Sequence, residues 1–386
     1  MVGRENGLSA LPLAGFVYSS CASILRLAVT TTKIEDIVSL PDLEVLAEQH
    51  LSPMAHAYIS GGAADELTLR ANREDWQRLR LNPRILVDVS QLDLKTEVLS
   101  QSLQLPILLA PAAFHRLCHP QAELATVAGA NQGGAGMVLS SYSTEPVEEV
   151  VRAAQNPVWF QLYTQANRAL TQEMIHRAEA AGCKALCVTV DTPVLGPRHR
   201  ESRAQFTLPA DFKLPNLNLG PVSHRPLRGA IYSELLNPSL TWKDIEWLRS
   251  ITKLPVLLKG VLNPEDACRA VEAGVAGIIA SNHGGRNLDT ATSTAVALPR
   301  IAERVQGKLT LLVDGGIRRG TDVLKALALG AQAVLIGRPY LYGLAFAGAE
   351  GVARVLEVLR NELMMAMALT GRTSVAEIDR SVIWDG

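Results

Sequence analysis

One pattern recurs eight times between residues 105 and 338. A short run rich in Leu, Val and Ile ends in polar or glycine residues, and an Ala- and Leu-rich stretch of helical character follows. The runs are 105–111, 136–141, 158–163, 185–191, 255–260, 277–285, 309–316 and 333–338. Strands alternating with helices form parallel βαβ units, and continuous apolar runs are typical of strands covered on both faces. The count predicts an α/β fold, a TIM (β/α)8 barrel. The alternative, an open doubly wound sheet, would place a G-x-G-x-x-G turn after an early strand, and we find none.

The rest of the chain divides around this barrel. We expect residues 1–33 to be a tail or targeting extension and residues 34–386 to be the functional domain. Within that domain, residues 34–100 predict an N-terminal helical cap, and residues 101–386 the barrel with its C-terminal helices. Residues 199–240 form a long loop after the fourth strand, where such loops often cover active sites.

Composition excludes several classes of protein. The 386 residues carry a net charge of −1, which gives no electrostatic case for binding nucleic acid or an anionic membrane surface. No apolar run approaches the length of a membrane span. The five cysteines are widely spread and fit neither a disulfide framework nor a zinc site. We therefore expect a cytoplasmic protein without a structural metal.

The strand ends carry the polar residues. In a barrel of this kind the active site lies where the carboxyl ends of the strands meet. Those ends supply Ser140, Gln161, Tyr163, Thr189, Asp191, Lys259, Ser281, His283, Arg286, Asp314, Arg318 and Arg338, with Arg198 shortly after the fourth strand. A lone Ser or Thr there is more often a turn residue. Several cations around one barrel mouth would repel each other unless anionic ligands bind between them.

Two glycine-rich turns predict a phosphate site. DGGIRRG follows the seventh strand and IGRP the eighth, which is where barrels of this class usually bind phosphate. Backbone N–H groups at such turns can surround a phosphate, and Arg338 can add a charge-assisted pair of hydrogen bonds. The alternative is that these glycines only permit tight turns.

The stretch SNHGGRNLD, residues 281–289, predicts acid–base chemistry beside a second anion. His283 is a base that titrates near neutral pH. Asp191 could hold its ring and stabilise the imidazolium. Arg198 and Arg286 could bind a carboxylate, with the hydroxyl of Tyr58 assisting.

These motifs together resemble a known family. SNHGGRNLD, VDGGIRRGTDVLKALALGAQAVLIGRP, QLY and TVDTPVLGPR are similar to the signatures of the FMN-dependent 2-hydroxy acid oxidases and dehydrogenases. The resemblance spans roughly residues 36–380. It departs at Asn287, where the family usually carries Gln, and in TATST, residues 290–294.

The resemblance implies FMN as cofactor and a role for each matching residue. FMN would be held by Ala112, Ala113, Ser140, Gln161, Thr189, Lys259, Ser281, Asp314, Gly316, Arg318, Gly337 and Arg338. Substrate would be bound by Tyr58, Tyr142, Tyr163, Arg198 and Arg286. The catalytic residues would be His283 as base, Asp191 as its partner and Tyr163, which would contact the substrate hydroxyl. Lys259 would lie where flavin reduction builds negative charge.

The reaction implied is oxidation of a small (S)-2-hydroxy acid to a 2-oxo acid, with O2 reduced to H2O2. Tyr142 and Ala113 favour small aliphatic substrates, L-lactate before glycolate. The alternatives are a dehydrogenase with another electron acceptor, or an oxidase of larger acids such as mandelate. Another FMN barrel, such as type 2 isopentenyl diphosphate isomerase, or a flavin protein without catalysis, is a more distant alternative. Members of this family commonly form tetramers, so the resemblance implies a homotetramer.

Overall fold

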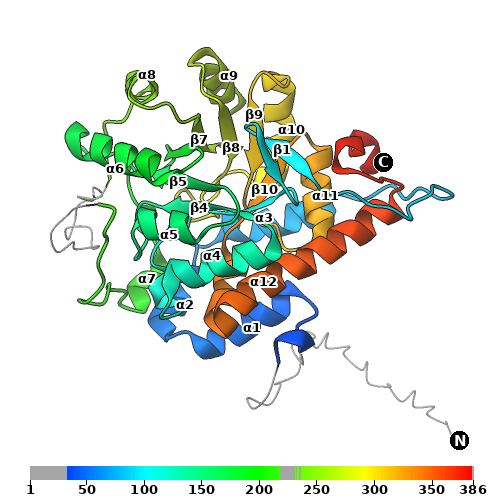
Figure 1. Ribbon diagram of the computed structural model, residues 1–386, viewed down its shortest axis with the longest axis horizontal. Helices are drawn as coiled ribbons and strands as arrows, with labels where there is room; N and C mark the ends of the chain where they lie inside the picture. Colours follow the sequence, from blue (N-terminus) through cyan, green and yellow to red (C-terminus); the bar gives the residue numbers. More distant parts are fainter. Residues whose placement is uncertain (1–32, 218–230, 232, 234–235, 385–386) are drawn as a thin grey trace, which may run out of the picture. The chain divides into compact units, whose positions relative to one another are not determined.

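Eight parallel strands close into a barrel in the order β10-β3-β4-β5-β6-β7-β8-β9 (Figure 1). The computed structural model describes residues 33–217, 231, 233 and 236–384. The barrel strands are β3 (Ile107–Leu109), β4 (Gly136–Ser140), β5 (Val158–Leu162), β6 (Leu186–Thr189), β7 (Val256–Val261), β8 (Gly277–Ala280), β9 (Thr310–Val313) and β10 (Ala333–Ile336). Each lies within one of the eight apolar runs or shifts by one residue. The predicted TIM barrel is confirmed.

Alternation along the strands separates two packed layers. Each strand places at least one side chain in a buried cluster inside the barrel, and these are Leu108, Val138, Trp159, Cys187, Leu257, Ile279, Leu312 and, from β10, both Ala333 and Leu335. Their neighbours along each strand belong to a second, larger cluster shared with the helices. Because successive side chains of a strand point to opposite faces, a run that is apolar throughout fills both layers.

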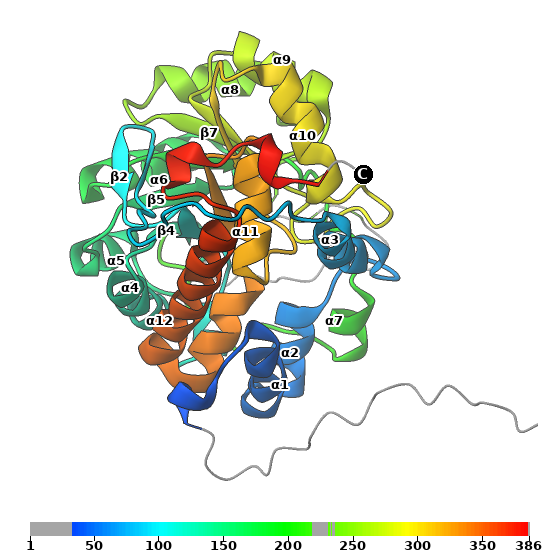
Figure 2. The same cartoon turned by 90° about the vertical axis from the view of Figure 1, so that its right-hand side faces the viewer.

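Helices cover the outside of the barrel (Figures 1 and 2). They are α4 (Ala122–Gly133), α5 (Val147–Ala153), α6 (Arg168–Ala181), α8 (Trp242–Ser250), α9 (Pro264–Glu272), α10 (Thr294–Val305), α11 (Gly320–Ala328) and α12 (Arg338–Leu369), with α7 (His199–Arg203) in the loop after β6. Short 3-10 turns are η1 (Ile34–Asp36), η2 (His115–Leu117), η3 (Val375–Glu377) and η4 (Arg380–Val382). Polar side chains begin several helices: Asn167 and Asn263 accept backbone N–H groups at the starts of α6 and α9. These caps hold the helices that follow β5 and β7 at the functional mouth.

The N-terminal segment contains α1 (Leu40–His50), α2 (Pro53–Ser60) and α3 (Leu67–Arg78). The α3 helix is fastened to loops at the barrel mouth. The amides of Asn72 and Asn282 bond to each other in both directions, at 2.8 and 2.7 Å. The indole of Trp76 donates to the carbonyl of Gly315. Because these bonds join segments far apart in the sequence, the loops after β8 and β9 are held in place from outside the barrel.

Asp289 ends the SNHGGRNLD stretch and has a structural role. Its carboxylate accepts the backbone N–H groups of Asp65 and Thr68, at 3.0 and 2.9 Å. Glu66, at the start of α3, makes no side-chain cap bond of its own. Asp289 therefore caps α3 from another part of the chain.

A small antiparallel hairpin was not predicted. Strands β1 (Thr96–Val98) and β2 (Gln101–Leu103) pair with each other, and Val98 and Leu103 join the cluster inside the barrel. The side chain of Gln101 accepts the indole N–H of Trp159. The hairpin closes the end of the barrel opposite the functional mouth. Its three-residue strands are too short for a periodic pattern to indicate them.

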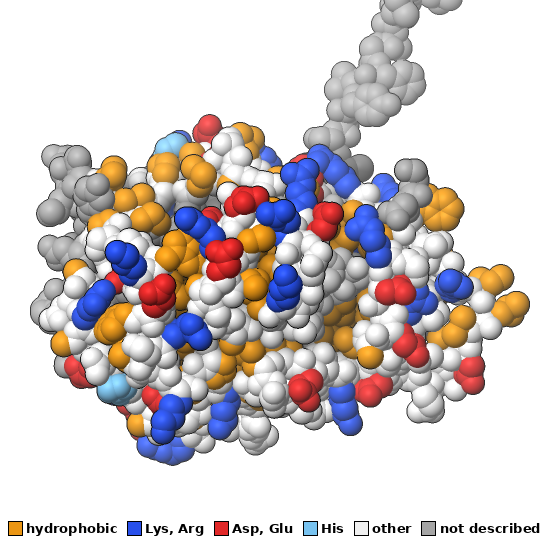
Figure 3. All heavy atoms as spheres, turned by 90° about the horizontal axis from the view of Figure 1, so that it is seen from above, with side chains coloured by type: hydrophobic (Ala, Val, Ile, Leu, Met, Phe, Trp, Pro, Cys, Tyr) orange, Lys and Arg blue, Asp and Glu red, His pale blue; other side chains and the backbone are white. Residues whose placement is uncertain are grey.

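On the face seen in Figure 3, Lys and Arg side chains lie among Asp and Glu side chains, which agrees with the near-zero net charge. Within the described ranges, no helix is both long and apolar enough to cross a bilayer. The predicted extension, residues 1–33, lies outside the described residues except for Lys33.

Candidate functional site

A pocket opens where the carboxyl ends of the strands meet. It is lined by Ala112, Ala113, Ser140, Tyr142, Gln161, Tyr163, Thr189, Arg198, Lys259, His283, Arg286, Asp314, Gly316, Arg318, Gly337, Arg338 and Tyr58, all of which the sequence had indicated. Leu195, Glu201, Phe206 and Leu236 also line it and were not predicted. Asp191 and Ser281 lie directly behind this surface, in contact with His283 and Lys259.

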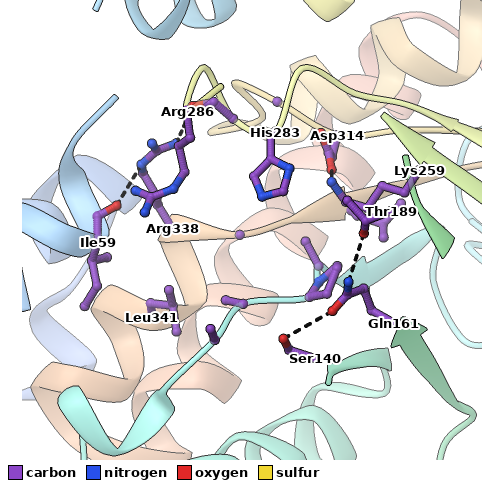
Figure 4. A pocket seen from close by; sticks show the side chains of 18 of the residues that line it. Ile59, Ser140, Gln161, Thr189, Lys259, His283, Arg286, Asp314, Arg338 and Leu341 are labelled. Carbon is purple, nitrogen blue, oxygen red and sulfur yellow. Dashed lines mark hydrogen bonds and ion pairs between the residues drawn. The ribbon is translucent and has the colours of Figure 1, made fainter. Parts of the chain in front are cut away.

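One wall consists of side chains on the barrel strands or directly after them, here called the strand-borne group: Ser140, Gln161, Thr189, Lys259 and Asp314 (Figure 4). The Gln161 amide accepts from the Ser140 hydroxyl at 3.2 Å and donates to the Thr189 hydroxyl at 3.0 Å. The backbone register places these three residues on neighbouring strands β4, β5 and β6. A fixed row of alternating donors and acceptors therefore lies along this wall.

Lys259 and Asp314 form a buried ion pair within that group. Lys259 Nζ lies 2.9 Å from Asp314 Oδ2 and donates to Ser281 Oγ, also at 2.9 Å. Their side chains are only 5% and 8% exposed. Burial alone would lower the pKa of Lys259, but the charges of Asp314 and Asp191 raise it above its ordinary value. Lys259 is therefore a permanent cation at the pocket wall.

The turns after β9 and β10 meet at the other end of this wall. Gly315 and Gly316 have φ of +93° and +84°, and a Cβ on Gly316 would lie 1.9 Å from the carbonyl oxygen of Asn72. Only glycine fits there. A Cβ on Gly337 would meet nothing closer than Ala110, at 3.9 Å. The backbone at Gly337 is therefore open to the pocket.

Arg338 has three backbone partners that the sequence did not indicate. Its guanidinium donates to the carbonyls of Ile59, Gly61 and Gly284, at 2.9, 2.7 and 2.9 Å. Figure 4 shows the contact with Ile59. It thus joins the end of α2 to the turn after β8. Burial lowers the pKa of Arg338, with the nearby charge of Arg286 acting in the same direction.

His283 stands at the centre of the pocket on an unusual backbone (Figure 4). His283, Gly284 and Gly285 have φ of +58°, +63° and +72°. A histidine in the left-handed region costs about 1–2 kcal/mol, so the surrounding structure must hold it there. His283 N–H donates to Ser281 Oγ, and Gly285 N–H donates to the Asn282 side chain. The two glycines let the chain turn so that the imidazole projects into the pocket.

The His283 ring is hydrogen-bonded on both sides. Nδ1 lies 2.9 Å from Asp191 Oδ1, and Nε2 lies 3.3 Å from the Tyr163 hydroxyl. Burial lowers the pKa of His283, the Asp191 carboxylate raises it, and the charges of Lys259 and Arg198 lower it further. The net direction is downward, so the imidazole is neutral at neutral pH with Nε2 facing the pocket.

Opposite the strands lies a group carried by α2, by α7 and its N-cap, and by the turn after β8, here called the loop-borne group: Tyr58, Arg198, Glu201 and Arg286. Arg286 donates to the carbonyls of Tyr58 and Gly61 at 2.6 and 3.0 Å, and its guanidinium lies 4.9 Å from the Tyr58 ring centroid. Both arginines reach one oxygen of Glu201, Arg198 at 3.3 Å and Arg286 at 3.0 Å. Two guanidinium groups thus share one carboxylate, which leaves net positive charge.

Glu201 is the main functional candidate that the sequence reading missed. It follows Arg198 by three residues at the start of α7, a spacing at which side chains of one helix meet. That spacing was the available signal. Its second partner, Arg286, is 85 residues away and could not be inferred from local sequence.

Aromatic rings line the space between the two groups. Tyr142 stacks on Tyr163 with centroids 5.0 Å apart, and Phe206 stacks on Tyr58 at 4.5 Å. The Phe114 ring is buried between Tyr58 and Tyr142, at 5.7 and 6.3 Å. The rings that line the pocket, together with Leu195 and Leu236, give it an apolar side beside its charged groups, and Phe114 packs behind them.

Comparison with known proteins identifies the family. The profile of the FMN-dependent dehydrogenases matches residues 47–385. The chain is 50% identical over 362 residues to an L-lactate oxidase of Nostoc sp., covering 91% of this chain and 99% of that protein. It is 45% identical over 353 residues to glycolate oxidase 3 of Oryza sativa subsp. indica, covering 90% and 96%. A crystal structure of mandelate oxidase with (S)-2-phenylpropionate superposes with a TM-score of 0.82 at 40% identity, covering 89% and 97%.

The chain belongs to the FMN-dependent dehydrogenase family. It is therefore an FMN oxidoreductase of the 2-hydroxy acid oxidase type, as its motifs had indicated.

The pocket of this FMN-dependent dehydrogenase suits its cofactor. Two buried polar atoms in the described residues lack a hydrogen-bond partner there, Asp314 Oδ1 and Arg318 Nε. A carboxylate oxygen can accept from a ribityl hydroxyl, and a guanidinium N–H can donate to a phosphate. The open backbone at Gly337 lies beside them. These free groups are the ones that a sugar phosphate needs.

Proposed function

We propose that the protein oxidises small (S)-2-hydroxy acids, L-lactate before glycolate, to 2-oxo acids and transfers the electrons to O2, which becomes H2O2. One observation carries the proposal: a neutral imidazole, held by a carboxylate, faces a pocket that has a buried cation on one wall and two arginines on the other.

FMN, when bound, would supply the acceptor for the two electrons that leave the substrate. Asp314, Arg318, Gly316 and Gly337 would hold its ribityl and phosphate groups. Ser140, Gln161 and Thr189, with the backbone at Ala112 and Ala113, would contact its ring. Lys259 would stabilise the negative charge that reduction places on the ring, and Ser281 would hold the Lys259 ammonium in position.

Arg338 would be a second phosphate ligand if its guanidinium exchanged hydrogen bonds to backbone carbonyls for hydrogen bonds to the phosphate. The end of its side chain has three carbonyl partners, and a phosphate is a stronger acceptor than any of them. The charge of Arg338 would then be paired with the FMN phosphate.

Arg198 and Arg286 would bind the substrate carboxylate, assisted by Tyr58. The single Glu201 carboxylate neutralises only one of the two guanidinium charges, so one positive charge is left for the substrate. Tyr163 and His283 would contact the 2-hydroxyl, because their polar atoms lie 3.3 Å apart on the pocket side. His283 Nε2 would accept a proton from the substrate, and Asp191 would stabilise the resulting imidazolium.

The apolar side of the pocket supports a small aliphatic side chain on the substrate. Tyr142 is 5% exposed and packs against Tyr163, so it narrows the space next to Ala113. Relatives that are oxidases of L-lactate and glycolate support the same choice, and the mandelate oxidase structures make an aromatic acid the alternative outcome.

The test is anaerobic reduction of the FMN enzyme by L-lactate, glycolate, a longer aliphatic acid and (S)-mandelate, followed by admission of O2. Bleaching by L-lactate faster than by the other acids, with H2O2 formed on reoxidation, is the expected result. Faster bleaching by mandelate would overturn the substrate choice. Slow reoxidation by O2, with rapid reoxidation by an artificial acceptor, would make the protein a dehydrogenase instead.

A homotetramer is part of the proposal. Exposed apolar side chains on residues 85–87 and at Leu369 support self-association, since Leu86 is 99% and Ile85 83% exposed. The backbone of Arg84 bonds to Leu369, so these side chains share one surface. Light scattering of the wild type and of a Leu86→Ser, Ile85→Ser variant would decide, with a tetramer for the first and smaller species for the second. A monomeric wild type would refute it.

A further inference from the structure

Asn287, one of the positions at which this chain departs from the family signature, contacts the backbone of Asp191 directly and its carboxylate through Thr192. Its side-chain nitrogen lies 2.9 Å from the carbonyl oxygen of Asp191 and 2.8 Å from Thr192 Oγ1. Thr192 Oγ1 in turn lies 2.9 Å from Asp191 Oδ1 and 3.3 Å from His283 Nδ1. Four residues from two loops thus meet around one hydroxyl group.

The chemistry of these groups fixes the direction of each hydrogen bond. A backbone carbonyl only accepts, so the NH2 side of the Asn287 amide must face Asp191. The same nitrogen therefore donates to Thr192 Oγ1. A hydroxyl has a single hydrogen, and the ionised Asp191 carboxylate can only accept, so the Thr192 hydrogen points to Asp191 Oδ1.

His283 Nδ1 consequently faces acceptors only. Asp191 Oδ1 and the remaining lone pair of Thr192 Oγ1 both require a hydrogen on Nδ1. In a neutral imidazole this leaves the lone pair on Nε2, which faces the pocket. If the Thr192 hydroxyl were free to turn, it could donate to Nδ1 and stabilise the other tautomer, whose Nε2 cannot accept a proton.

We propose that Asn287 and Thr192 are positioning residues: they fix the direction of the hydrogen bonds around Asp191 so that His283 presents the Nε2 lone pair to the substrate. The inference rests on the proposed function, because it assumes that His283 acts as the base. The other charged or titratable groups near His283 are Lys259 from β7, Arg198 at the start of α7 and Tyr163 after β5. None of them contacts Thr192 Oγ1 in the described bonds, so Thr192 can be changed without removing them.

The experiment compares Thr192→Val with Thr192→Ser, and Asn287→Asp with Asn287→Gln. Val has the shape of Thr without the hydroxyl, and Asp has the shape of Asn without the N–H donors. Each FMN-loaded variant is mixed anaerobically with L-lactate across the acid and neutral pH range. The rate of flavin reduction at saturation, the substrate dissociation constant and the FMN content are measured separately. Asn263→Asp is the matched control, because Asn263 only accepts a hydrogen bond at the start of α9 and Asp can do the same.

Thr192→Val and Asn287→Asp should reduce flavin about 10- to 100-fold more slowly, the range for partners that orient a metal-bound imidazole. The substrate dissociation constant and FMN content should stay near the wild-type values. In Asn287→Asp the added negative charge should also move the acid limb of the rate to higher pH. Thr192→Ser and Asn287→Gln should recover much of the rate. The inference would be overturned if Thr192→Val and Asn287→Asp reduced flavin at the wild-type rate with the wild-type pH dependence. It would also be overturned if they lost only FMN content or substrate affinity.

A second readout separates this inference from the proposed function. The nitrogen NMR shifts of His283 in the substrate-free enzyme, assigned by their loss in His283→Asn, report which ring nitrogen bears the hydrogen. Hydrogen on Nδ1 is expected in the wild type and in Thr192→Val, which keeps Asp191 and has no hydroxyl that could donate to Nδ1. A mixture is expected in Asn287→Leu, in which the Thr192 hydroxyl loses its donor and is free to turn. This result would support the positioning role even if no 2-hydroxy acid reduces the flavin, in which case the proposed function alone would fail. A wild-type enzyme with hydrogen on Nε2 would refute the positioning role whatever its substrate.

Discussion

The strand-borne and loop-borne groups face each other across one pocket, yet they balance charge differently. Lys259 on β7 and Asp314 directly after β9 pair one cation with one anion at the barrel wall. Arg198 and Arg286 share the single carboxylate of Glu201 and take their other bonds from backbone carbonyls. The first group is neutral as a unit, which suits a ligand that stays bound. The second has an excess of positive charge, which suits an anionic substrate that binds and dissociates in each turnover.

This contrast predicts that substitutions in the strand-borne group lower the FMN content and the free energy of unfolding. Substitutions in the loop-borne group should change only the affinity for substrate. His283, between the two, should affect only the chemical step.

The largest effect is expected for His283→Asn. Both groups stay intact, so FMN and substrate should still bind, but no base accepts the substrate proton. Flavin reduction should fall by about 10²- to 10⁴-fold, the usual contribution of a positioned acid–base group. Stopped-flow reduction by L-lactate measures this. The yellow colour of the variant serves as the control for cofactor binding, and a normal rate would remove His283 from the base role.

Lys259→Met should be next, and it should act on stability and FMN content together. Asp314 would be left buried without its cation, which typically costs about 3–5 kcal/mol. The free energy of unfolding in denaturant and the FMN retained after gel filtration measure the two consequences. Adding Asp314→Asn to Lys259→Met should recover stability but not FMN. If FMN is retained fully in the single variant, Lys259 does not contact the cofactor.

The contrast also explains what the sequence could and could not predict. The strand-borne residues follow apolar runs directly, so counting strands places Gln161, Lys259 and Asp314 at the same mouth. The loop-borne group depends on contacts such as Glu201 with Arg286 and Tyr58 with Phe206, which join separate loops and the cap. No local pattern encodes those pairings. Tyr58, Arg198 and Arg286 were proposed as carboxylate ligands from their residue types, and the family resemblance implied the same role, but their contacts with one another could not be predicted and Glu201 was not found.

The same limit applies to Arg338 and to the β1–β2 hairpin. The turn IGRP predicted an arginine beside the pocket, and the structure places it there. Its three carbonyl partners come from α2 and from the turn after β8, so their geometry depends on tertiary packing. The hairpin is likewise stabilised by tertiary packing, because Val98 and Leu103 are buried in the cluster inside the barrel.

Arg286→Lys should weaken substrate binding without loss of FMN. A lysine cannot hold the carbonyls of Tyr58 and Gly61 and also reach a carboxylate in the plane of a guanidinium. The substrate dissociation constant should rise roughly ten- to hundredfold, which corresponds to about 1.5–3 kcal/mol for hydrogen bonds to a charged group. Titration of FMN absorbance with a carboxylate inhibitor measures it. Arg304→Lys, on the outer surface, is the matched control, and loss of FMN from Arg286→Lys would contradict the division into two groups.

Glu201→Gln should have a smaller effect in the opposite direction. The carboxylate of Glu201 competes with the substrate carboxylate for the same two guanidinium groups, and Gln keeps an acceptor oxygen while removing the charge. The dissociation constant for L-lactate should fall about fivefold, close to 1 kcal/mol. Glu357→Gln, on the exposed side of α12, controls for the change itself. Weaker binding would show that Glu201 orients the arginines more than it competes for them.

The last prediction concerns the pH dependence of the wild-type rate, which changes little near neutral pH and falls in acid. The pKa of His283 sets this fall, and that pKa depends on charges in both groups. Burial, Lys259 and Arg198 lower the pKa of His283, and Asp191 opposes them, with a net lowering from 6.5. Only neutral His283 accepts a proton, so kcat/KM should be level near neutral pH and fall tenfold per pH unit below the folded-state pKa. The midpoint should therefore lie below pH 6.5. Asp191→Asn removes the carboxylate charge that raises the pKa of His283, so in that variant the midpoint should move to still lower pH while the rate at neutral pH drops. A wild-type midpoint above 6.5 would mean that the Asp191 carboxylate outweighs burial and the two cations, and the imidazole would then be partly charged before substrate arrives.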